Sequence, residues 1–236
     1  MTICDPAARM TAVDHLTELR GRLIWSIAAI AAGTAISFCF ISDVIAFLTA
    51  PAGHLYFVKP AEVVVIYFKT AVLFGCFLAS PVIFYEFWAF ILPALTRRER
   101  TWACVLVPVS VLSFAGGIAF SYAFVLPQSL HFLMNFGGDT FQPLLSMENY
   151  LDFVILMVFP FGFIFNMPLI LVTLAGAGLV TGRSLAKARK YVIILSFLFA
   201  AVITPTPDIL SQCLMAVPMI ILYEASLLFI RFIMRK

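Results

Sequence analysis

The feature that most constrains this chain is a series of long stretches without a charged side chain. Residues 23–41, 105–126 and 153–174 are three of them. Each stretch provides the roughly 20 predominantly apolar residues that a helix needs to cross a membrane. None shows the alternation of apolar and polar residues that is typical of a transmembrane β-strand. The stretches therefore predict an all-α membrane protein.

Composition supports this class along the whole chain. Of the 236 residues, 63% are hydrophobic and only 11% are charged, whereas about a quarter of the residues in a soluble domain are charged. Apolar segments occur at about 23–42, 67–92, 103–126, 151–176, 190–205 and 210–231. The fifth is the shortest, because only residues 191–203 form its apolar part, a length that would also suit a re-entrant segment.

The basic residues predict how these segments cross the membrane. Thirteen of the 15 Lys and Arg side chains fall in four clusters: Arg9, Arg20, Arg22; Arg97, Arg98, Arg100; Arg183, Lys187, Arg189, Lys190; and Arg231, Arg235, Lys236. If every cluster is cytoplasmic, as the positive-inside rule favours, two crossings separate each cluster from the next. The expectation is a single domain, 1–236, of six transmembrane helices in the cytoplasmic (inner) membrane. Both termini would be cytoplasmic, and helices five and six would be short.

The remaining segments receive roles from this topology. Residues 1–22 are predicted to be a cytoplasmic amphipathic segment, and residues 93–102 and 177–190 to be inner loops. The outer loops, 43–66 and 127–150, contain apolar residues and are expected to be packed caps rather than loose linkers. Prolines inside the predicted helices favour kinks and a curved shape, although proline is in any case commoner in membrane helices. They are Pro81, Pro108, Pro160, Pro168 and Pro218.

Two acidic residues stand among the cytoplasmic arginines. Glu18 lies four residues before Arg22, and Glu99 lies within the loop that carries three arginines. One interpretation is local: Glu18 forms a helical salt bridge, and Glu99 neutralises part of its loop. The other interpretation is that the two carboxylates bind a ligand with two arginines, because guanidinium and carboxylate pair in a specific bidentate geometry.

Three motifs carry a resemblance to a known family. They are His15-Leu16-x-Glu18-Leu19-Arg20-x-Arg22-Leu23; Ser80-Pro81-Val82-Ile83 with Trp88-Ala89-Phe90-Ile91-x-Pro93-Ala94-Leu95 and Glu99-Arg100; and Thr204-Pro205-x-Pro207-Asp208-x-x-Ser211-Gln212 with Pro218 and Glu224. In this order and over nearly the whole chain, they resemble the TatC family, the multispanning subunit of the twin-arginine protein translocase. The resemblance implies a core receptor that binds twin-arginine signal peptides of folded cargo proteins at its cytoplasmic face. Export would be driven by the proton gradient.

The same resemblance implies roles for particular residues. Signal-peptide binding would involve Glu18, Glu99, Phe90, Leu95, Arg20 and Arg22. Binding of the single-helix partners TatA and TatB would involve Thr204, Gln212, Asn166 and Glu224. Self-association within a larger complex in the lipid bilayer is also implied, with no cofactor and no nucleic acid.

Asn166 departs from the family pattern, because many relatives carry a membrane-embedded glutamate at this position. An amide can form hydrogen bonds but cannot exchange a proton, so a mechanism that needs protonation here is in doubt. Asn166 would either contact a partner or bind carbonyl groups freed by Pro168. The two intramembrane acids, Glu86 and Glu224, are candidates for function or for internal pairing.

Two other classes of protein fit less well. No H-E-x-x-H, G-x-S-x-G or clustered His/Cys motif is present, so an enzyme is not expected. The five cysteines have no metal-ligand spacing and are interpreted as packing or lipid-facing residues. A solute transporter would suit the kinked helices and intramembrane acids, but it would more often show internal repeats and a polar cluster at the membrane midplane.

Overall fold

The computed structural model describes residues 12–52, 55–57, 59–91, 103–135, 145–204, 208–232 and 234. Within these residues the regular elements are all helical. They are α1 (Ala12–Phe38), α2 (Ile41–Thr49), η1 (Ala50–Ala52), α3 (Pro60–Ile91), α4 (Ala103–Phe120), the π-helix η4 (Ser121–Val125), α5 (Leu126–Asn135), α6 (Met147–Ile164), α7 (Met167–Gly176), α8 (Gly182–Ile203) and α9 (Ile209–Phe232).

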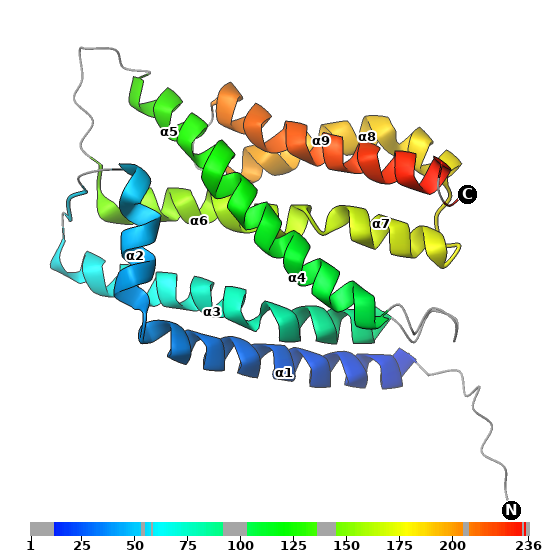
Figure 1. Cartoon of the computed structure of the whole chain (residues 1–236), viewed down its shortest axis with the longest axis horizontal. Helices are drawn as coiled ribbons and strands as arrows, with labels where there is room; N and C mark the ends of the chain where they lie inside the picture. Colours follow the sequence, from blue (N-terminus) through cyan, green and yellow to red (C-terminus); the bar gives the residue numbers. More distant parts are fainter. Residues whose placement is uncertain are drawn as a thin grey trace, which may run out of the picture.

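The long helices run back and forth between two ends of the molecule. Helices α1 and α3 lie side by side, α4 and α5 cross the near face diagonally, and α8 and α9 lie along the opposite edge (Figure 1). The start of α1 and the end of α9 lie at one end, called here the Glu18 end, whereas α2 lies at the other, called the α2 end (Figure 1). Helix ends that are far apart in the sequence therefore lie close together at each end of the molecule.

Five helical stretches of the described residues are long and apolar enough to cross a membrane: His15–Phe38, Ala61–Ile91, Val105–Asn135, Met147–Gly176 and Ile209–Phe232. The all-helical membrane class predicted from the sequence is therefore confirmed. Helix α8 is not among the five, because its first half carries Arg183, Lys187, Arg189 and Lys190.

The helices extend further than the hydropathy of the sequence indicated. Helices α8 and α9, expected to be short, contain 22 and 24 residues. The start of α8 is fixed by Thr181, whose side chain accepts a hydrogen bond from the Ser184 N–H, and Lys and Arg continue a helix well. The range 43–66, expected as an outer loop, contains most of α2 and the beginning of α3. Helices therefore continue through polar and charged residues that the hydropathy of the sequence assigned to loops.

Helices α1 and α3 approach each other most closely at a pair of glycines. A Cβ atom built on Gly33 would lie 2.5 Å from the Gly75 carbonyl oxygen, and one on Gly75 would lie 2.5 Å from the Thr34 backbone nitrogen. Small residues allow close backbone contact between membrane helices, where packing replaces the hydrophobic effect as the driving force. The glycine pair therefore sets how the residues of α1 face those of α3.

Helices α6 and α7 are separated by a break at Asn166. Pro168 lies in the first turn of α7 and has no N–H to donate to the preceding turn. The Asn166 N–H donates to the Phe163 carbonyl at 3.0 Å, and the Asn166 side chain donates to the Gly162 carbonyl at 2.9 Å. The amide thus satisfies a carbonyl at the break, while its buried oxygen Oδ1 has no hydrogen-bond partner among the described residues.

Polar contacts hold the α2 end together. The Glu62 carboxylate, which is only 4% exposed, accepts hydrogen bonds from the Lys59 N–H, the Ser146 hydroxyl and the Glu148 N–H. It therefore joins the start of α3 to the start of α6. Hydrophobic residues of α2, including Ile41 and Ile45, are buried in the main core. Within the described residues, this end is therefore held by both polar and apolar contacts.

Candidate functional site

The candidate site lies at the Glu18 end, where the start of α1 meets the last turns of α3. Arg22 is placed between two carboxylates. Its Nε and Nη2 atoms donate to Glu18 Oε1 at 3.0 and 2.5 Å, and its Nη1 atom donates to Glu86 Oε2 at 2.9 Å. The salt bridge between Glu18 and Arg22 is the local pair that the i,i+4 spacing predicts. The contact with Glu86 joins residues 64 positions apart.

The three side chains are partly buried and carry one net negative charge. Their exposed fractions are 23% for Glu18, 24% for Arg22 and 16% for Glu86. Because Arg22 contacts only one oxygen of Glu18, the other oxygen, Oε2, remains buried without a hydrogen-bond partner in the described part of the chain. A buried carboxylate oxygen without a donor is costly. The group is therefore suited to accept a hydrogen bond from an additional cation.

An aromatic pair lies beside these charges. The rings of His15 and Phe90 are stacked, with centroids 4.2 Å apart and an interplanar angle of 17°. Leu16 and Leu19, on the same segment of α1, are 64% and 42% exposed. The site thus combines an acidic group with an exposed apolar surface.

The structure brings together three of the six predicted peptide-binding residues. Glu18, Arg22 and Phe90 come together where α1 and α3 meet, and Arg20 is exposed on the same segment of α1. Glu99 and Leu95 lie outside the described residues.

The partnership of Glu86 with Arg22 was not identified from the sequence. In the sequence, Glu86 stands out only as an acidic residue inside an apolar helix. That marks it as a candidate functional residue but does not identify Arg22 as its partner.

The predicted partner-binding residues are dispersed over the molecule. Thr204 and Gln212 lie where α8 meets α9, and both donate to α8: Thr204 Oγ1 to the Ala200 carbonyl and Gln212 Nε2 to the Phe197 carbonyl, each at 2.9 Å. Asn166 lies at the break between α6 and α7. These donors satisfy carbonyls of their own chain.

Glu224 also has a partner within the chain. Its carboxylate accepts a hydrogen bond from Arg189 of α8 at 2.8 Å. Internal pairing was one of the two possibilities for this residue, and the ion pair is about a third to a half exposed. An exposed pair of this kind contributes little to stability.

Comparison with known proteins gives a consistent result. The family model described as "Sec-independent protein translocase protein (TatC)" matches residues 14–218. A Sec-independent protein translocase protein TatC of Desulforapulum autotrophicum is 40% identical over 222 residues, which cover 91% of this chain and 82% of the relative. One from Aquifex aeolicus is 39% identical over 235 residues, covering 96% of this chain and 97% of the relative.

A solved structure shares the fold as well. It is described as "Crystal Structure of Twin Arginine Translocase Receptor- TatC", and it matches with a TM-score of 0.82 at 41% identity over 90% of this chain and 96% of that chain. Motif order, fold and sequence identity over most of both chains lead to one conclusion. This chain belongs to the TatC family and is a membrane-spanning component of the Sec-independent, twin-arginine protein translocase.

Proposed function

We propose that this chain is the core receptor subunit of the translocase and binds twin-arginine signal peptides at its cytoplasmic face, through Glu18 together with Glu99. Recruited TatA and TatB subunits complete the export of folded proteins, driven by the proton gradient. The observation that carries the proposal is the buried Oε2 atom of Glu18, which has no hydrogen-bond partner among the described residues and lies in an acidic group at the end of the molecule where basic helix ends gather.

The proposed topology has six spans with both termini in the cytoplasm. Basic residues of the described helices concentrate at the Glu18 end: Arg20, Arg22, Arg183, Lys187, Arg189, Lys190 and Arg231. Positive charge favours the cytoplasmic side. Helix α8 would be the remaining span, with its basic first half at the cytoplasmic surface. Its apolar part, residues 191–203, is about 20 Å long at 1.5 Å per residue, so it would cross where the bilayer is locally thin or where other helices surround it.

The geometry of the acidic group supports the proposed binding of a peptide arginine. Arg22 occupies Oε1 of Glu18, so a peptide guanidinium donates to Oε2 without displacing Arg22. The net negative charge of the group favours a second cation. The stacked ring of Phe90 offers a flat surface on which guanidinium packs better than ammonium.

The test is photo-crosslinking of a twin-arginine peptide to the full-length membrane-inserted protein. Glu18→Ala and Glu99→Ala should each weaken crosslinking, and loss of a hydrogen bond to a charged group predicts about a tenfold effect or more for Glu18. Glu148→Gln, at the α2 end, is the matched control and should leave crosslinking unchanged. Conversion of the peptide arginines to lysines should also abolish capture, whereas a solute transporter would not respond to either peptide. Unchanged crosslinking in the Glu18→Ala/Glu99→Ala variant would refute the site.

We propose that partner recruitment involves Asn166, Thr204, Gln212 and Glu224. The support is strongest for Asn166, whose Oδ1 atom is buried and accepts no hydrogen bond from the described residues. A polar side chain of a partner helix would donate to it at a gain of roughly 0.6–2 kcal/mol. Asn166→Ala should reduce co-purification of the single-helix partners while peptide crosslinking stays normal. Normal co-purification of the partners with that variant would show that Asn166 only stabilises the helix break through its bond with Gly162.

A further inference from the structure

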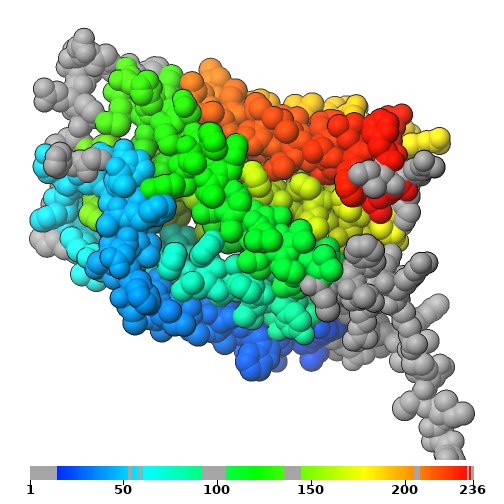
Figure 2. All heavy atoms as spheres, viewed as in Figure 1, coloured from blue at the N-terminus to red at the C-terminus, as the bar shows by residue number. Residues whose placement is uncertain are grey.

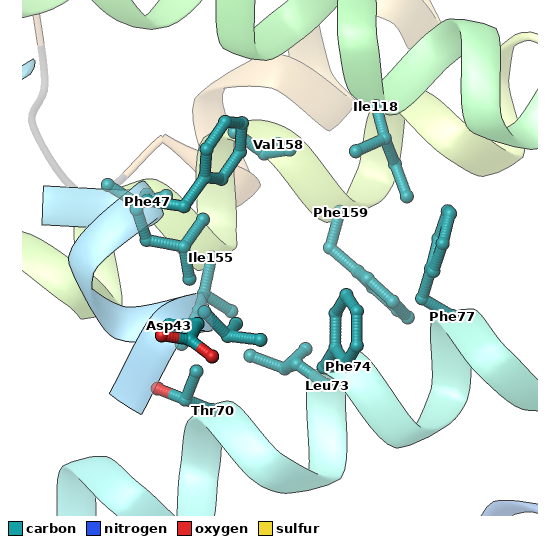
Figure 3. Close-up of a pocket in the computed structure, with 13 residues that line it drawn as sticks. Asp43, Phe47, Thr70, Leu73, Phe74, Phe77, Ile118, Ile155, Val158 and Phe159 are labelled. Carbon is teal, nitrogen blue, oxygen red and sulfur yellow. The ribbon is translucent and has the colours of Figure 1, made fainter. Parts of the chain in front are cut away.

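A pocket of about 420 Å³ opens at the α2 end, far from the candidate peptide site. Helices α2, α3, α4 and α6 supply its walls, and the near face of the molecule is hollowed between α2 and α4 (Figure 2). Most of the surface is apolar, with phenylalanines at positions 47, 74, 77 and 159. Asp43 and Thr70 are the polar side chains of the lining, and their oxygen atoms lie on the same side of the pocket (Figure 3).

The hydroxyl group of Thr70 distinguishes this pocket from a simple packing defect. Thr34, Thr49 and Thr173 each donate to the carbonyl four residues earlier in their helices. Thr70 is equally helical and only 1% exposed, but its Oγ1 atom has no hydrogen-bond partner within the described residues. A buried unpaired hydroxyl costs about 1–3 kcal/mol. Thr70 is one of the lining residues, so a bound group with hydrogen-bonding capacity would remove that cost once the Thr70 side chain rotates toward the pocket.

The charge around the opening favours a cation. Asp43 lies in the first turn of α2 and is exposed, and no ion pair forms with it among the described residues. The nearby Lys69 is already bound to Asp152 at 2.9 Å and approaches Glu148 at 3.7 Å. These four residues together carry two net negative charges. An anionic headgroup would be repelled, whereas an ammonium group would be attracted.

The length of the pocket favours an acyl chain over a peptide helix. A helix that spans the membrane is about 30 Å long. From Thr70 to Phe77 the wall formed by α3 is about 10 Å long, at a rise of 1.5 Å per residue. That length suits the upper part of a single hydrocarbon chain.

We propose that this pocket binds one phospholipid whose headgroup carries a primary ammonium, as in phosphatidylethanolamine. The ammonium pairs with Asp43, the Thr70 hydroxyl bonds the polar part of the lipid, and one acyl chain lies between Phe74, Phe77 and Phe159. The roof of the site is preformed, because Tyr122 and Tyr150 donate hydrogen bonds to the carbonyls of Phe47 and Leu48 in α2. A preformed site avoids the free-energy cost of ordering a loop on binding. This site is independent of the proposed peptide receptor.

The test measures lipid binding to the purified full-length protein in detergent by native mass spectrometry. Phosphatidylethanolamine should bind more tightly than phosphatidylcholine, which has no ammonium hydrogen to donate, and than the anionic phosphatidylglycerol. Asp43→Asn and Thr70→Val should each weaken phosphatidylethanolamine binding by about threefold to tenfold. Thr173→Val removes a back-bonded hydroxyl outside the pocket and is the matched control. Equal binding of all three lipids, or no effect of either pocket variant, would overturn the proposal.

A second measurement locates the acyl chain directly. Phosphatidylethanolamine with a photoreactive group at the middle of one chain should label peptides that contain Phe77 or Phe159. Substitution of Ile155, another lining residue, by Trp should fill the pocket and abolish that labelling. Labelling spread evenly over lipid-exposed helices would refute the site. Labelling of the pocket by a photoreactive twin-arginine peptide in place of the lipid would also refute it.

Discussion

Gly33 offers a direct test of how α1 is held against α3. A Cβ atom at Gly33 would lie 2.5 Å from the Gly75 carbonyl oxygen, whereas ordinary van der Waals contact begins at 3.4 Å. The two backbones would therefore have to separate by about 0.9 Å in a Gly33→Ala variant. Overpacking of this kind costs roughly 1–3 kcal/mol. The strain would act on the same helix pair that carries Glu18 and Glu86.

Gly21 provides the matched control on the same helix. A Cβ atom there meets no other atom within 4 Å, so Gly21→Ala gains only the helix propensity of alanine, about 0.5–1 kcal/mol. Because both variants gain this propensity, the difference between them isolates the clash at about 1–3 kcal/mol. The assay is equilibrium unfolding in mixed micelles, followed by circular dichroism, with peptide crosslinking measured in parallel. Equal free energies of unfolding for the two variants would show that the glycine contact does not determine the packing of α1.

The remaining predictions concern three polar contacts. Glu86→Gln should weaken capture of a twin-arginine peptide about threefold in the crosslinking assay, because Arg22 would then pair with Glu18 alone and compete for it; unchanged capture would contradict this role. Glu62→Gln should lower the free energy of unfolding by about 1.5–3 kcal/mol, because a buried carboxylate that accepts three hydrogen bonds is replaced by an amide; an unchanged thermal midpoint would count against it. Tyr223→Phe should cost about 0.5–1.5 kcal/mol by removing the 2.7 Å bond to the Leu185 carbonyl, and the loss should appear as faster hydrogen exchange in α8.

The candidate site was only partly predictable from the sequence. The pairing of Glu18 with Arg22 follows from their spacing on one helix, and the structure confirms it. The contact of Arg22 with Glu86 depends on the rotation and register of two helices. No spacing rule within one segment can supply that information, because the two residues share no local periodicity.

Asn166 shows the same limit in another way. Pro168 indicated a helix break from the sequence alone, and the structure places that break between α6 and α7. The sequence could not show whether the Asn166 amide bonds a carbonyl at the break or a partner helix, because that depends on where its nitrogen and its oxygen point. The structure shows that the nitrogen bonds Gly162 and that the oxygen is unpaired among the described residues.

The sequence by itself determined the membrane class, the main apolar segments and the family, because the transfer of apolar residues into a bilayer and the motif order are properties of single segments. Tertiary structure alone decided that Arg22 lies between two acids, that α2 roofs an apolar pocket, and that the Thr70 hydroxyl has no hydrogen-bond partner among the described residues. The physical reason is that such contacts join residues tens of positions apart. Close contacts between helices, such as that of Gly33 with Gly75, fix how the residues of one helix face those of the other.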